Sequence, residues 1–445
     1  MSKKGKGKEN LDRTMAQGGS SGSSLFKFSK EVENRLDAYK EDTLVFAPLK
    51  SGVYQVAKII ACRIIEPTPA NEALAEGQDL EYYVHFEGYN RRIDKWVLHK
   101  DLVRDDKKMT EELGKRKVME EEEKNEGAGF LENDEDAGMD EKQVTMHEQA
   151  TKIKTIEWVQ IGKFKCETWY FSPYPEQYHH IDCLFICHYC LSFFSCKEDM
   201  ERHSSKCDIR HPPGDEIYRD EKVAVFEVDG QREPIYCENL CYLSKLFLDH
   251  KNLGYEVGPF LFYCMCEYDD EGYQIGGYFS KEKDFSKNWD VETIGQEKME
   301  KERNYNNLSC ILVFPFHQRK GYGKFLISFS YELGILEGRQ GTPETPLSDL
   351  GHRTYISWWS HRLLSFLKQY QGDEISVQLL SQKTGILQTD IINLFESFKI
   401  LRYHQGDHYF VVTDEFIETL IKRAGHPGHP VATENIHWTG YEWYN

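Results

Sequence analysis

The sequence predicts a mixed α+β fold, in which a small N-terminal β barrel precedes a larger core of strands and helices. Two observations predict it. Short runs of alternating and β-branched residues occur between residues 41 and 104. After a charged segment, aromatic and aliphatic residues become dense from about residue 155 onward. The 445-residue chain is long enough for two or three domains, one of them large enough for an enzymatic core.

The first 40 residues and the segment 105–151 lack the apolar pattern of a folded element. Residues 1–40 begin with a basic stretch and continue with a Gly/Ser-rich one, and we expect them to be disordered. The segment 105–151 is acidic and charged, with few large apolar residues. This composition is typical of a mostly disordered linker, in which a helical stretch is an alternative.

Composition restricts the class of protein. No apolar run approaches the ~20 residues that span a bilayer, and the N-terminus lacks the apolar stretch of a signal peptide. We therefore expect no membrane partner and a cytosolic or nuclear location. The twelve cysteines are then expected to be reduced, as metal ligands, core residues or nucleophiles. The formal net charge of −19 fits a cationic partner such as a lysine-rich tail, although composition alone favours acidity that simply keeps the protein soluble.

Hydrophobic patterning predicts the elements of both folded parts. Between residues 41 and 104, the runs 43–49, 54–65 and 81–89 predict strands of a small antiparallel barrel. The core has predicted strands at 224–230, 261–270 and 273–280, and helical apolar spacing at 239–251, 324–338 and 361–371. Near the end, residues 376–412 follow the order helix, turn, helix and hairpin, a pattern similar to a winged helix.

Four residues have the spacing of a zinc site. Cys187, Cys190, His203 and Cys207 give the pattern C-x2-C-x12-H-x3-C. The first pair fits a turn between strands and the second pair lies one helical turn apart, so all four can converge on one tetrahedral Zn²⁺. Four protein ligands leave no open position, which makes the zinc structural. The alternative is four unrelated residues in a cysteine-rich chain.

The segment 318–324 (QRKGYGK) lies between an apolar strand and a predicted helix. Glycines at such a turn let backbone N–H groups point at one spot, and the helix N-terminus adds partial positive charge, so the turn predicts an anion site. A lone G-x-G is most often a tight turn. This one is flanked by basic residues and is similar to the Q/R-x-x-G-x-G signature that binds the diphosphate of acetyl-CoA in N-acetyltransferases. A Walker loop is excluded, because no G-K-[ST] follows.

Several motifs in one order resemble the MYST family of histone acetyltransferases. They are WYFSPYP at 169–175, HPPGDEIYR at 211–219, LFLDHK at 246–251, GYFSKEK at 277–283, QRKGYGK at 318–324, FSYEL at 329–333 and PLSDLG at 346–351. The resemblance implies a MYST-type domain at 152–430. Its expected parts are a C2HC zinc finger at 183–210, a GNAT-like acetyl-CoA core at 220–360 and a winged-helix-like region at 361–425, with a C-terminal tail at 431–445.

The resemblance also implies the activity. It predicts a nuclear histone lysine N-acetyltransferase that transfers acetyl from acetyl-CoA to a histone tail, histone H4 first, within a multisubunit chromatin complex. Glu344 occupies the position of the catalytic glutamate, Cys310 that of the cysteine beside the acetyl group, and Lys251 that of a lysine that becomes autoacetylated. Cofactor contacts fall on Ile311, Leu312, Val313, Gln318, Arg319, Lys320, Gly321, Tyr322, Gly323, Lys324, Ser348 and Ser357.

Acetyl transfer requires a neutral amine, whereas a free lysine has a pKa of about 10.4. A carboxylate acting as general base removes the proton, which is the role expected of Glu344. A buried thiol such as Cys310 is more often a small hydrophobe, and an acetyl-cysteine intermediate is the alternative use of it. Direct attack in a ternary complex is the preferred mechanism, because Glu344 alone completes the chemistry.

Residues 82–96 resemble the chromo barrel of the NuA4/TIP and male-specific-lethal types of MYST enzyme. Five aromatic residues of this region suggest a methyl-lysine cage, although aromatics in a small barrel are more often core: Tyr82, Tyr83, Phe86, Tyr89 and Trp96. Binding of RNA or nucleosomal DNA through basic residues, Arg91 and Arg92 among them, is an equal alternative.

The chain departs from the family in three places. It has an insertion at 284–304, it reads SCILVFPFHQ where the family has ACILTLPPYQ, and Gln405 replaces a lysine that helps to hold coenzyme A. Two alternatives therefore stand beside the histone acetyltransferase: a catalytically weakened chromatin-binding or scaffold protein, and a small-molecule or non-histone N-acetyltransferase. Retention of Glu344, Cys310 and the 318–324 loop argues against lost activity.

Overall fold

The computed structural model describes residues 38–65, 80–105, 108, 151–179, 181–249, 251, 256–283, 305–371, 375–404, 407–410 and 413–439. They belong to two compact units, a smaller one within residues 1–84 and 95–105 and a larger one within 85–94 and 106–445. Nearly all of the predicted disordered N-terminus and linker lies outside the described residues, as do the insertion at 284–304 and Gln405. Within the described residues, no helix combines the length and apolar character needed to cross a membrane.

The N-terminal strands form a four-stranded sheet in chain order, which confirms the predicted small β domain. Its strands are β1 (Leu44–Pro48), β2 (Tyr54–Ile64), β3 (Leu80–Phe86) and β4 (Lys95–Leu98), with short 3-10 turns at Arg91–Ile93 and His99–Asp101. Burial alternates along β1, as expected for a strand with one face in a core. The N–H of Phe46 donates to the Val103 carbonyl oxygen at 2.7 Å, and the N–H of Val103 donates back at 3.0 Å, so Val103 covers the free edge of β1.

The larger unit is built on a five-stranded sheet with the order β14-β12-β11-β10-β9. These strands are β9 (Asp215–Arg219), β10 (Val223–Asp229), β11 (Phe260–Asp269), β12 (Gly272–Glu282) and β14 (Ile311–Val313), and every neighbouring pair is antiparallel. The three strands predicted from the apolar runs at 224–230, 261–270 and 273–280 are β10, β11 and β12. Beside this sheet, β13 (Tyr305–Leu308) and β15 (Gly341–Pro343) pair in parallel.

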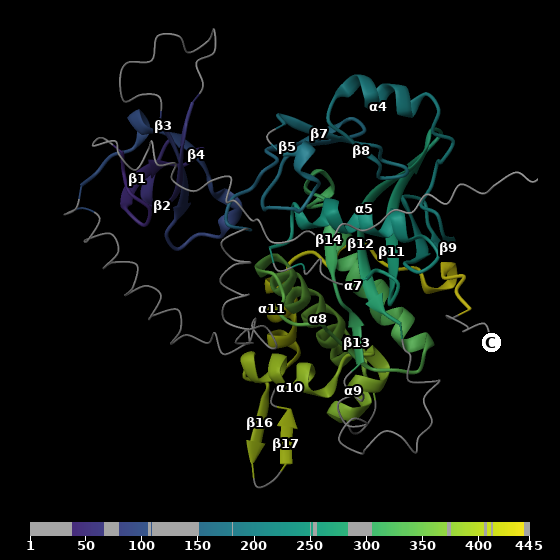
Figure 1. The fold of residues 1–445 in the computed structure, drawn as a ribbon. Coiled ribbons are helices and arrows are strands. Elements are labelled where there is room, and N and C mark those ends of the chain that lie inside the picture. Colours follow the sequence, from purple (N-terminus) through teal and green to yellow (C-terminus); the bar gives the residue numbers. More distant parts are fainter. Residues whose placement is uncertain are drawn as a thin grey trace, which may run out of the picture. The chain divides into compact units, whose positions relative to one another are not determined.

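Both faces of this sheet are buried, and successive residues serve opposite faces because side chains alternate along a strand. In β11, Leu261, Tyr263 and Met265 belong to one hydrophobic cluster, whereas Phe262, Cys264 and Cys266 belong to the other. Helices α7 (Tyr322–Leu336) and α8 (Asp349–Gln369) contribute to the first cluster, and α5 (Pro234–Lys245) contributes to the second. Figure 1 shows α5 and α7 on either side of the sheet. Two covered faces explain why these strands read as continuous apolar runs.

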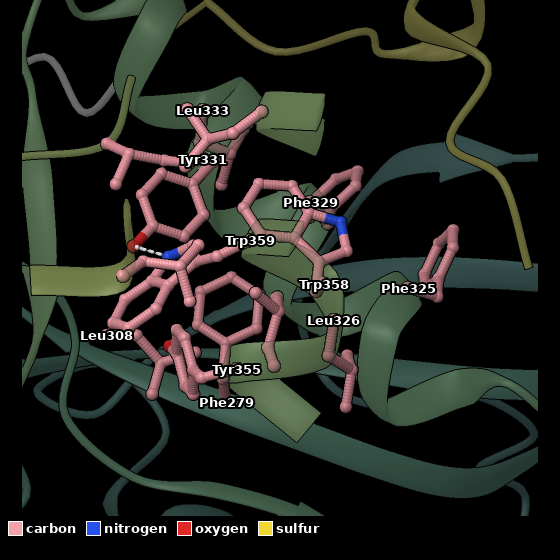
Figure 2. Packing of buried hydrophobic residues seen from close by; sticks show 14 of the residues in the cluster. Phe279, Leu308, Phe325, Leu326, Phe329, Tyr331, Leu333, Tyr355, Trp358 and Trp359 are labelled. Carbon is pink, nitrogen blue, oxygen red and sulfur yellow. Dashed lines mark hydrogen bonds between the residues drawn. The ribbon is translucent and has the colours of Figure 1, made fainter. Parts of the chain in front are cut away.

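Aromatic side chains from α7 and α8 fill the first cluster, as Figure 2 shows. The rings of Tyr331 and Trp358 stack with centroids 4.8 Å apart. The indole N–H of Trp359 donates to the Tyr331 hydroxyl oxygen at 2.9 Å, so the buried phenol has a partner. Because α7 and α8 are fixed by this packing, their N-terminal ends, which face the functional site, are held in place.

The zinc-binding segment is part of a second, smaller sheet with the order β6-β5-β7-β8. It comprises β5 (Trp158–Ile161), β6 (Phe164–Glu167), β7 (Cys183–Ile186) and β8 (Phe193–Phe194), followed by α4 (Lys197–Ser204), with a 3-10 turn at Glu176–Tyr178. This sheet begins about 25 residues before the predicted finger boundary at 183. The earlier strand β5 belongs to it because β5 pairs in parallel with β7. Ile161, Leu184 and Ile186 pack in the same cluster as α5.

The C-terminal region has the predicted order of helix, turn, helix and hairpin. Its elements are α9 (Val377–Thr384), α10 (Gln388–Ser397), β16 (Leu401–His404), β17 (Asp407–Phe410) and α11 (Asp414–Arg423). The long helix α8 runs from Asp349 to Gln369 without a break at the expected core boundary of 360/361. Core and winged-helix-like region therefore share one helix.

The described part of the expected tail, residues 431–439, packs back onto the central sheet. The N–H of His437 donates to the Ile217 carbonyl oxygen at 2.8 Å, next to an isolated bridge between Tyr218 and Ile436. The indole N–H of Trp438 donates to a Glu227 carboxylate oxygen, also at 2.8 Å. A short 3-10 turn spans Thr433–Asn435. These residues thus line the edge strand β9.

The helix expected at 239–251 begins earlier and ends earlier in the structure. Pro234 occupies its first turn, where a missing N–H costs nothing, and the helix ends at Lys245. The Lys245 ammonium donates to the carbonyl oxygens of Leu248 (3.3 Å) and Asp249, so it draws the following turn back over the helix end. The apolar residues after Lys245 belong to this turn and pack into the same core.

Asp390 near the start of α10 provides a stability prediction. Burial raises the pKa of its carboxyl to about 6, and one carboxylate oxygen has no hydrogen-bond partner among the described residues. Because its pKa in the unfolded chain is about 3.9, the folded state holds the proton more tightly, and the free energy of unfolding falls as pH rises from about 4 through about 6. We expect Asp390→Asn to raise stability by roughly 1–3 kcal/mol at pH 8 and to change it little at pH 4. Urea unfolding at both pH values measures this, and a larger gain at pH 4 would contradict it.

Candidate active site

A cleft of about 1180 Å³ opens where β14, α7 and α8 meet. Its walls include the strand Ile311–Val313, the turn 318–321, the first residues of α7 and the first residues of α8. Leu248 and Asp249, after α5, and residues of the segment 424–428, after α11, also line it, as do Trp169, Tyr170 and Phe247. Eleven of the twelve predicted cofactor contacts line this cleft: Ile311, Leu312, Val313, Gln318, Arg319, Lys320, Gly321, Tyr322, Gly323, Lys324 and Ser348.

The turn before α7 has the geometry of an anion cradle. Gly321 caps the helix in the left-handed conformation at φ 87°, and Arg319 is also left-handed at φ 63°. The first intrahelical bond runs from the N–H of Phe325 to the Gly321 carbonyl oxygen, so the preceding N–H groups, those of residues 322–324, lack helical acceptors. These groups and the positive end of the helix dipole suit the diphosphate of coenzyme A.

A side chain at residue 321 would block the close approach of the C-terminal segment. An added Cβ would lie 2.7 Å from the backbone nitrogen of His429 and 3.1 Å from Gly428. The Lys324 ammonium also donates to the His426 carbonyl oxygen. Glycine is therefore required at 321 for both the turn conformation and the contact with residues 428–429.

The strand Ile311–Val313 is well placed to bind an extended ligand through its backbone. β14 is an edge strand that pairs with β12 on one side only, with Val313 opposite Gly277 and Ile311 opposite Phe279. Half of the backbone N–H and C=O groups of an edge strand point away from its partner. The Val313 carbonyl oxygen accepts from the Gln318 side-chain amide at 3.1 Å. Because residues 311–313 line the cleft, the other outward groups face the space in which an extended ligand would lie.

Cys310 lies immediately before this strand and is held by its neighbours. Its N–H donates to the Ser280 hydroxyl at 3.2 Å, and its carbonyl oxygen accepts from the Ser280 N–H at 2.8 Å. The Lys251 ammonium donates to the Cys310 sulfur at 3.5 Å and lies 5.9 Å from the centroid of the Tyr278 ring. The thiol is half-buried. Backbone anchoring on β12 thus fixes where the thiol enters the site.

Glu344 follows β15, and its backbone ties it to the strand that leads to Cys310. Its N–H donates to the Leu308 carbonyl oxygen at 2.8 Å, two residues before Cys310. The side chain is exposed. A neighbouring carboxyl, Glu282 at the end of β12, has its pKa raised by burial and then by the charge of Glu344. The parallel pairing of β13 and β15 therefore brings Glu344 to the Cys310 end of β14.

Apart from the zinc ligands, four predicted site residues do not line the cleft in the part of the chain that the structure describes: Glu344, Cys310, Ser357 and Lys251. Cys310 adjoins the lining residue Ile311, so it stands at the edge of the cleft. The hydroxyl of Ser357 donates to the Ala424 carbonyl oxygen, which ties α8 to the cleft wall. Ser348 is the N-cap of α8, and its oxygen accepts from the Gly351 N–H at 3.0 Å.

Sequence reasoning missed the C-terminal wall of the cleft. Ala424, Gly425, His426 and Gly428 line it although they are about 100 residues from the turn that they face. Their sequence, AGHPGH at 424–429, reads as an ordinary loop. The start of α8 was expected to contribute only Ser348, yet residues 349–352 line the cleft as well.

The four predicted zinc ligands converge, as their spacing requires. One potential ligand atom from each of Cys187, Cys190, His203 and Cys207 lies within 4.8 Å of all the others. Cys187 and Cys190 flank the turn between β7 and β8, while His203 lies in α4 and Cys207 just after it. The Cys190 sulfur and the His203 Nε2 are 3.2 Å apart. Three thiols and one imidazole fit a structural Zn²⁺ with no open position.

In the N-terminal sheet, three of the five suggested cage residues belong to the core. Tyr82, Tyr83 and Phe86 are buried. The Trp96 ring contacts Tyr83 edge-on, and the Arg63 guanidinium lies over it at 4.1 Å from the centroid. These side chains thus have the packing role that was the alternative to a methyl-lysine cage.

Comparison with known proteins agrees with this geometry. Residues 211–435 match the MOZ/SAS family, 153–207 match the MYST family zinc finger domain, and 39–104 match the RNA binding activity-knot of a chromodomain. The chain is 41% identical over 406 residues to Histone acetyltransferase of the MYST family 1 of Arabidopsis thaliana, covering 90% of this chain and 85% of that protein. This protein belongs to the MYST family of acetyltransferases.

Two further relatives extend the comparison beyond plants. Histone acetyltransferase ESA1 of Mycosarcoma maydis is 44% identical over 296 residues, covering 66% of this chain and 49% of that protein. Histone acetyltransferase Tip60 homolog of Caenorhabditis elegans is 41% identical over 277 residues, covering 61% and 57%. As a MYST acetyltransferase the protein uses acetyl-CoA, and its zinc finger carries a structural zinc. The MYST finger match extends from 153 to 207, in agreement with the sheet that includes β5 and β6.

Proposed function

We propose that this MYST enzyme transfers acetyl from acetyl-CoA to a lysine of a histone tail, and that histone H4 is its preferred substrate. The observation that carries the proposal is one path: the 318–324 cradle, the edge strand 311–313 and Cys310 in succession, with Glu344 tied beside it. The relatives named above are histone acetyltransferases, which supports a histone acceptor. The formal net charge of −19 suits a lysine-rich tail.

In this mechanism each group has a separate task. The cradle N–H groups hold the diphosphate, the backbone of residues 311–313 aligns the pantetheine arm, and Ser348 and Ser357 support the start of α8 and the C-terminal wall. Glu344 removes the proton from the incoming ammonium. The neutral amine would then attack the thioester carbonyl while a backbone N–H of the 311–313 segment holds the developing oxyanion. Cleavage of the carbon–sulfur bond would release the coenzyme A thiolate, which takes up the proton that Glu344 removed. Cys310 borders the acetyl group without having to form a covalent intermediate.

Lys251 is proposed as a site of autoacetylation. Its ammonium is within 3.5 Å of the Cys310 sulfur, at the end of the proposed cofactor path. The same ammonium lies 5.9 Å from the centroid of the buried Tyr278 ring.

The cellular setting proposed for the enzyme is the nucleus, within a multisubunit chromatin complex. For the N-terminal sheet we propose RNA or DNA as ligand in preference to methyl-lysine. Residues 39–104 match a domain described by RNA binding activity, and the rings of Tyr82, Tyr83 and Phe86 are buried.

A radiolabelled acetyl-CoA assay with nucleosomes, histone H4 peptide and free amines as separate acceptors tests the proposal. We expect transfer to nucleosomes and H4 peptide, with free amines much slower. Preferential transfer to free amines would replace the histone by a small acceptor. Cofactor binding without transfer to any acceptor would favour the weakened scaffold instead.

A further inference from the structure

One carboxylate on the central sheet contacts the cradle turn at three places. Glu267 in β11 accepts a hydrogen bond from the Lys320 ammonium at 2.5 Å and from the Tyr322 hydroxyl at 2.6 Å. Its oxygen is also 3.3 Å from the Nδ1 of His317. All three partners lie within 317–322, from the end of the segment after β14 to the first residue of α7, whereas Glu267 precedes them by about 50 residues.

The three contacts alternate with the two unusual backbone positions of the turn. Residues 317, 320 and 322 contact Glu267, and the left-handed residues are Arg319 at φ 63° and Gly321 at φ 87°. A left-handed conformation at a non-glycine residue is unfavourable and persists only where the surroundings fix it. Lys320 and Tyr322 bond Glu267 directly, and Lys320 also links the carboxylate to His317 on the other side of Arg319. These contacts supply that restraint, so the carboxylate sets the shape that aims the cradle N–H groups.

The charges of Glu267 and Lys320, with His317 beside them, direct the Lys320 side chain toward the sheet. His317 is only 1% exposed, and burial lowers its pKa, so the ring is neutral. Its Nδ1 accepts from the Lys320 ammonium at 3.1 Å and therefore lies beside Glu267 without donating to it. Burial would raise the pKa of Glu267, but the hydrogen bonds from Lys320 and Tyr322 hold it below its usual value. Glu267 is therefore ionised at neutral pH and compensates the Lys320 charge.

We propose that Glu267 is a positioning residue for the diphosphate of acetyl-CoA, and that the Lys320 ammonium braces the turn against Glu267 while its backbone lines the cleft. This inference rests on the proposed function. It assigns direct cationic contact with the cofactor to Arg319 and Lys324, the other basic residues of the cradle.

The test compares acetyl-CoA with S-acetylpantetheine, which lacks the diphosphate. For Glu267→Gln we expect the KM for acetyl-CoA to rise about tenfold, the loss expected when one charge-assisted anchor is weakened, with kcat within about twofold of wild type. The kcat/KM for S-acetylpantetheine and the KM for H4 peptide should not change. Glu216→Gln is the matched control. Glu216 lies in β9 of the same sheet, and like Glu267 it accepts from a cationic side chain, that of Arg219, and from a tyrosine hydroxyl, that of Tyr273.

Substitution of Lys320 distinguishes bracing of the turn from direct binding of the diphosphate. If Lys320 acts through Glu267, Lys320→Met and the double variant should each show the same rise in KM as Glu267→Gln. If the KM for acetyl-CoA of the double variant rises by the product of the two single-variant increases, Lys320 contacts the phosphate directly, and the role given to Lys320 is overturned. An unchanged KM for acetyl-CoA in Glu267→Gln would overturn the inference as a whole.

Two further measurements address a variant that does not fold and a wild-type protein that is inactive. If Glu267→Gln does not fold, Tyr322→Phe removes one hydrogen bond to the same carboxylate, and we expect it to raise the KM for acetyl-CoA about threefold. An unchanged KM there would overturn the inference. Failure of the wild-type protein to transfer acetyl would refute the proposed function instead, and it is seen before any variant is compared.

Discussion

Glu344→Gln is expected to lower kcat for acetyl transfer by about 10²–10⁴-fold, the range usual for loss of a general base, with little change in the affinity for acetyl-CoA. An amide has nearly the shape of the carboxylate but accepts no proton at neutral pH. Glu344 is tied into the fold by its backbone N–H, which the substitution leaves unchanged. Its side chain is exposed, and among the described residues it does not line the cleft that we propose for the cofactor.

Steady-state transfer to H4 peptide and calorimetric binding of coenzyme A separate the two effects. Glu238→Gln is a suitable control, because Glu238 is an exposed carboxylate on the outer side of α5. The deficit of Glu344→Gln should narrow at alkaline pH, since lysine amines, with a pKa of about 10.4, then lose the proton without help. Equal rates for wild type and Glu344→Gln at neutral pH would remove Glu344 from the mechanism.

Local patterns predicted the parts of the site that lie within one short segment. The zinc ligands span 21 residues, and their spacing alone predicts that they meet. The cradle 318–324 was recognised because a strand, a glycine turn and a helix follow one another directly. In both places the geometry depends only on residues close together in the chain, so the local sequence pattern is sufficient to predict it.

Contacts between distant segments could not be predicted in the same way. The apolar runs of β10 and β11 indicate two covered faces but not which helix covers which face. Glu267 reads as one acidic residue at the end of an apolar strand, and only the register of β11 in the sheet brings it beside Lys320. The segment 424–428 likewise reaches the cleft because α11 packs near α8, where the Lys368 ammonium lies 2.8 Å from Glu418.

The resemblance supplied residues that local patterns do not mark. Glu344 lies in an irregular segment between prolines, and nothing in its periodicity distinguishes it from an exposed loop glutamate. The pairing of β13 with β15 shows why this segment matters, since it delivers Glu344 to the level of Leu308. Ser357 was also taken from the resemblance, and its hydroxyl bonds the Ala424 carbonyl, so any effect on the cofactor passes through the C-terminal wall.

Cys190→Ser is expected to release the structural zinc and to loosen α4. This eight-residue helix, Lys197–Ser204, buries none of its residues, so hydrophobic packing contributes little to holding it. Apparent binding free energies of structural zinc are roughly 10–16 kcal/mol in zinc-finger peptides, which exceeds any single side-chain contact in this segment. The ion is therefore what holds α4 against the β7–β8 turn, and losing one of its four ligands weakens that link directly.

The effect should be confined to part of the finger. Ile161, Leu184 and Ile186 are anchored in the core shared with α5, so β5 and β7 should stay folded when zinc is lost. Zinc content by atomic absorption, with hydrogen exchange along the chain, tests this, and we expect faster exchange within 187–207 but not in β10 or β11. Cys196→Ser is the matched control, since its half-exposed thiol contacts Asp199 and is not a ligand. If Cys190→Ser retains one zinc per chain and exchanges hydrogen like the control, the four zinc ligands do not hold α4. If protection is lost throughout β10 and β11, the central sheet depends on the metal.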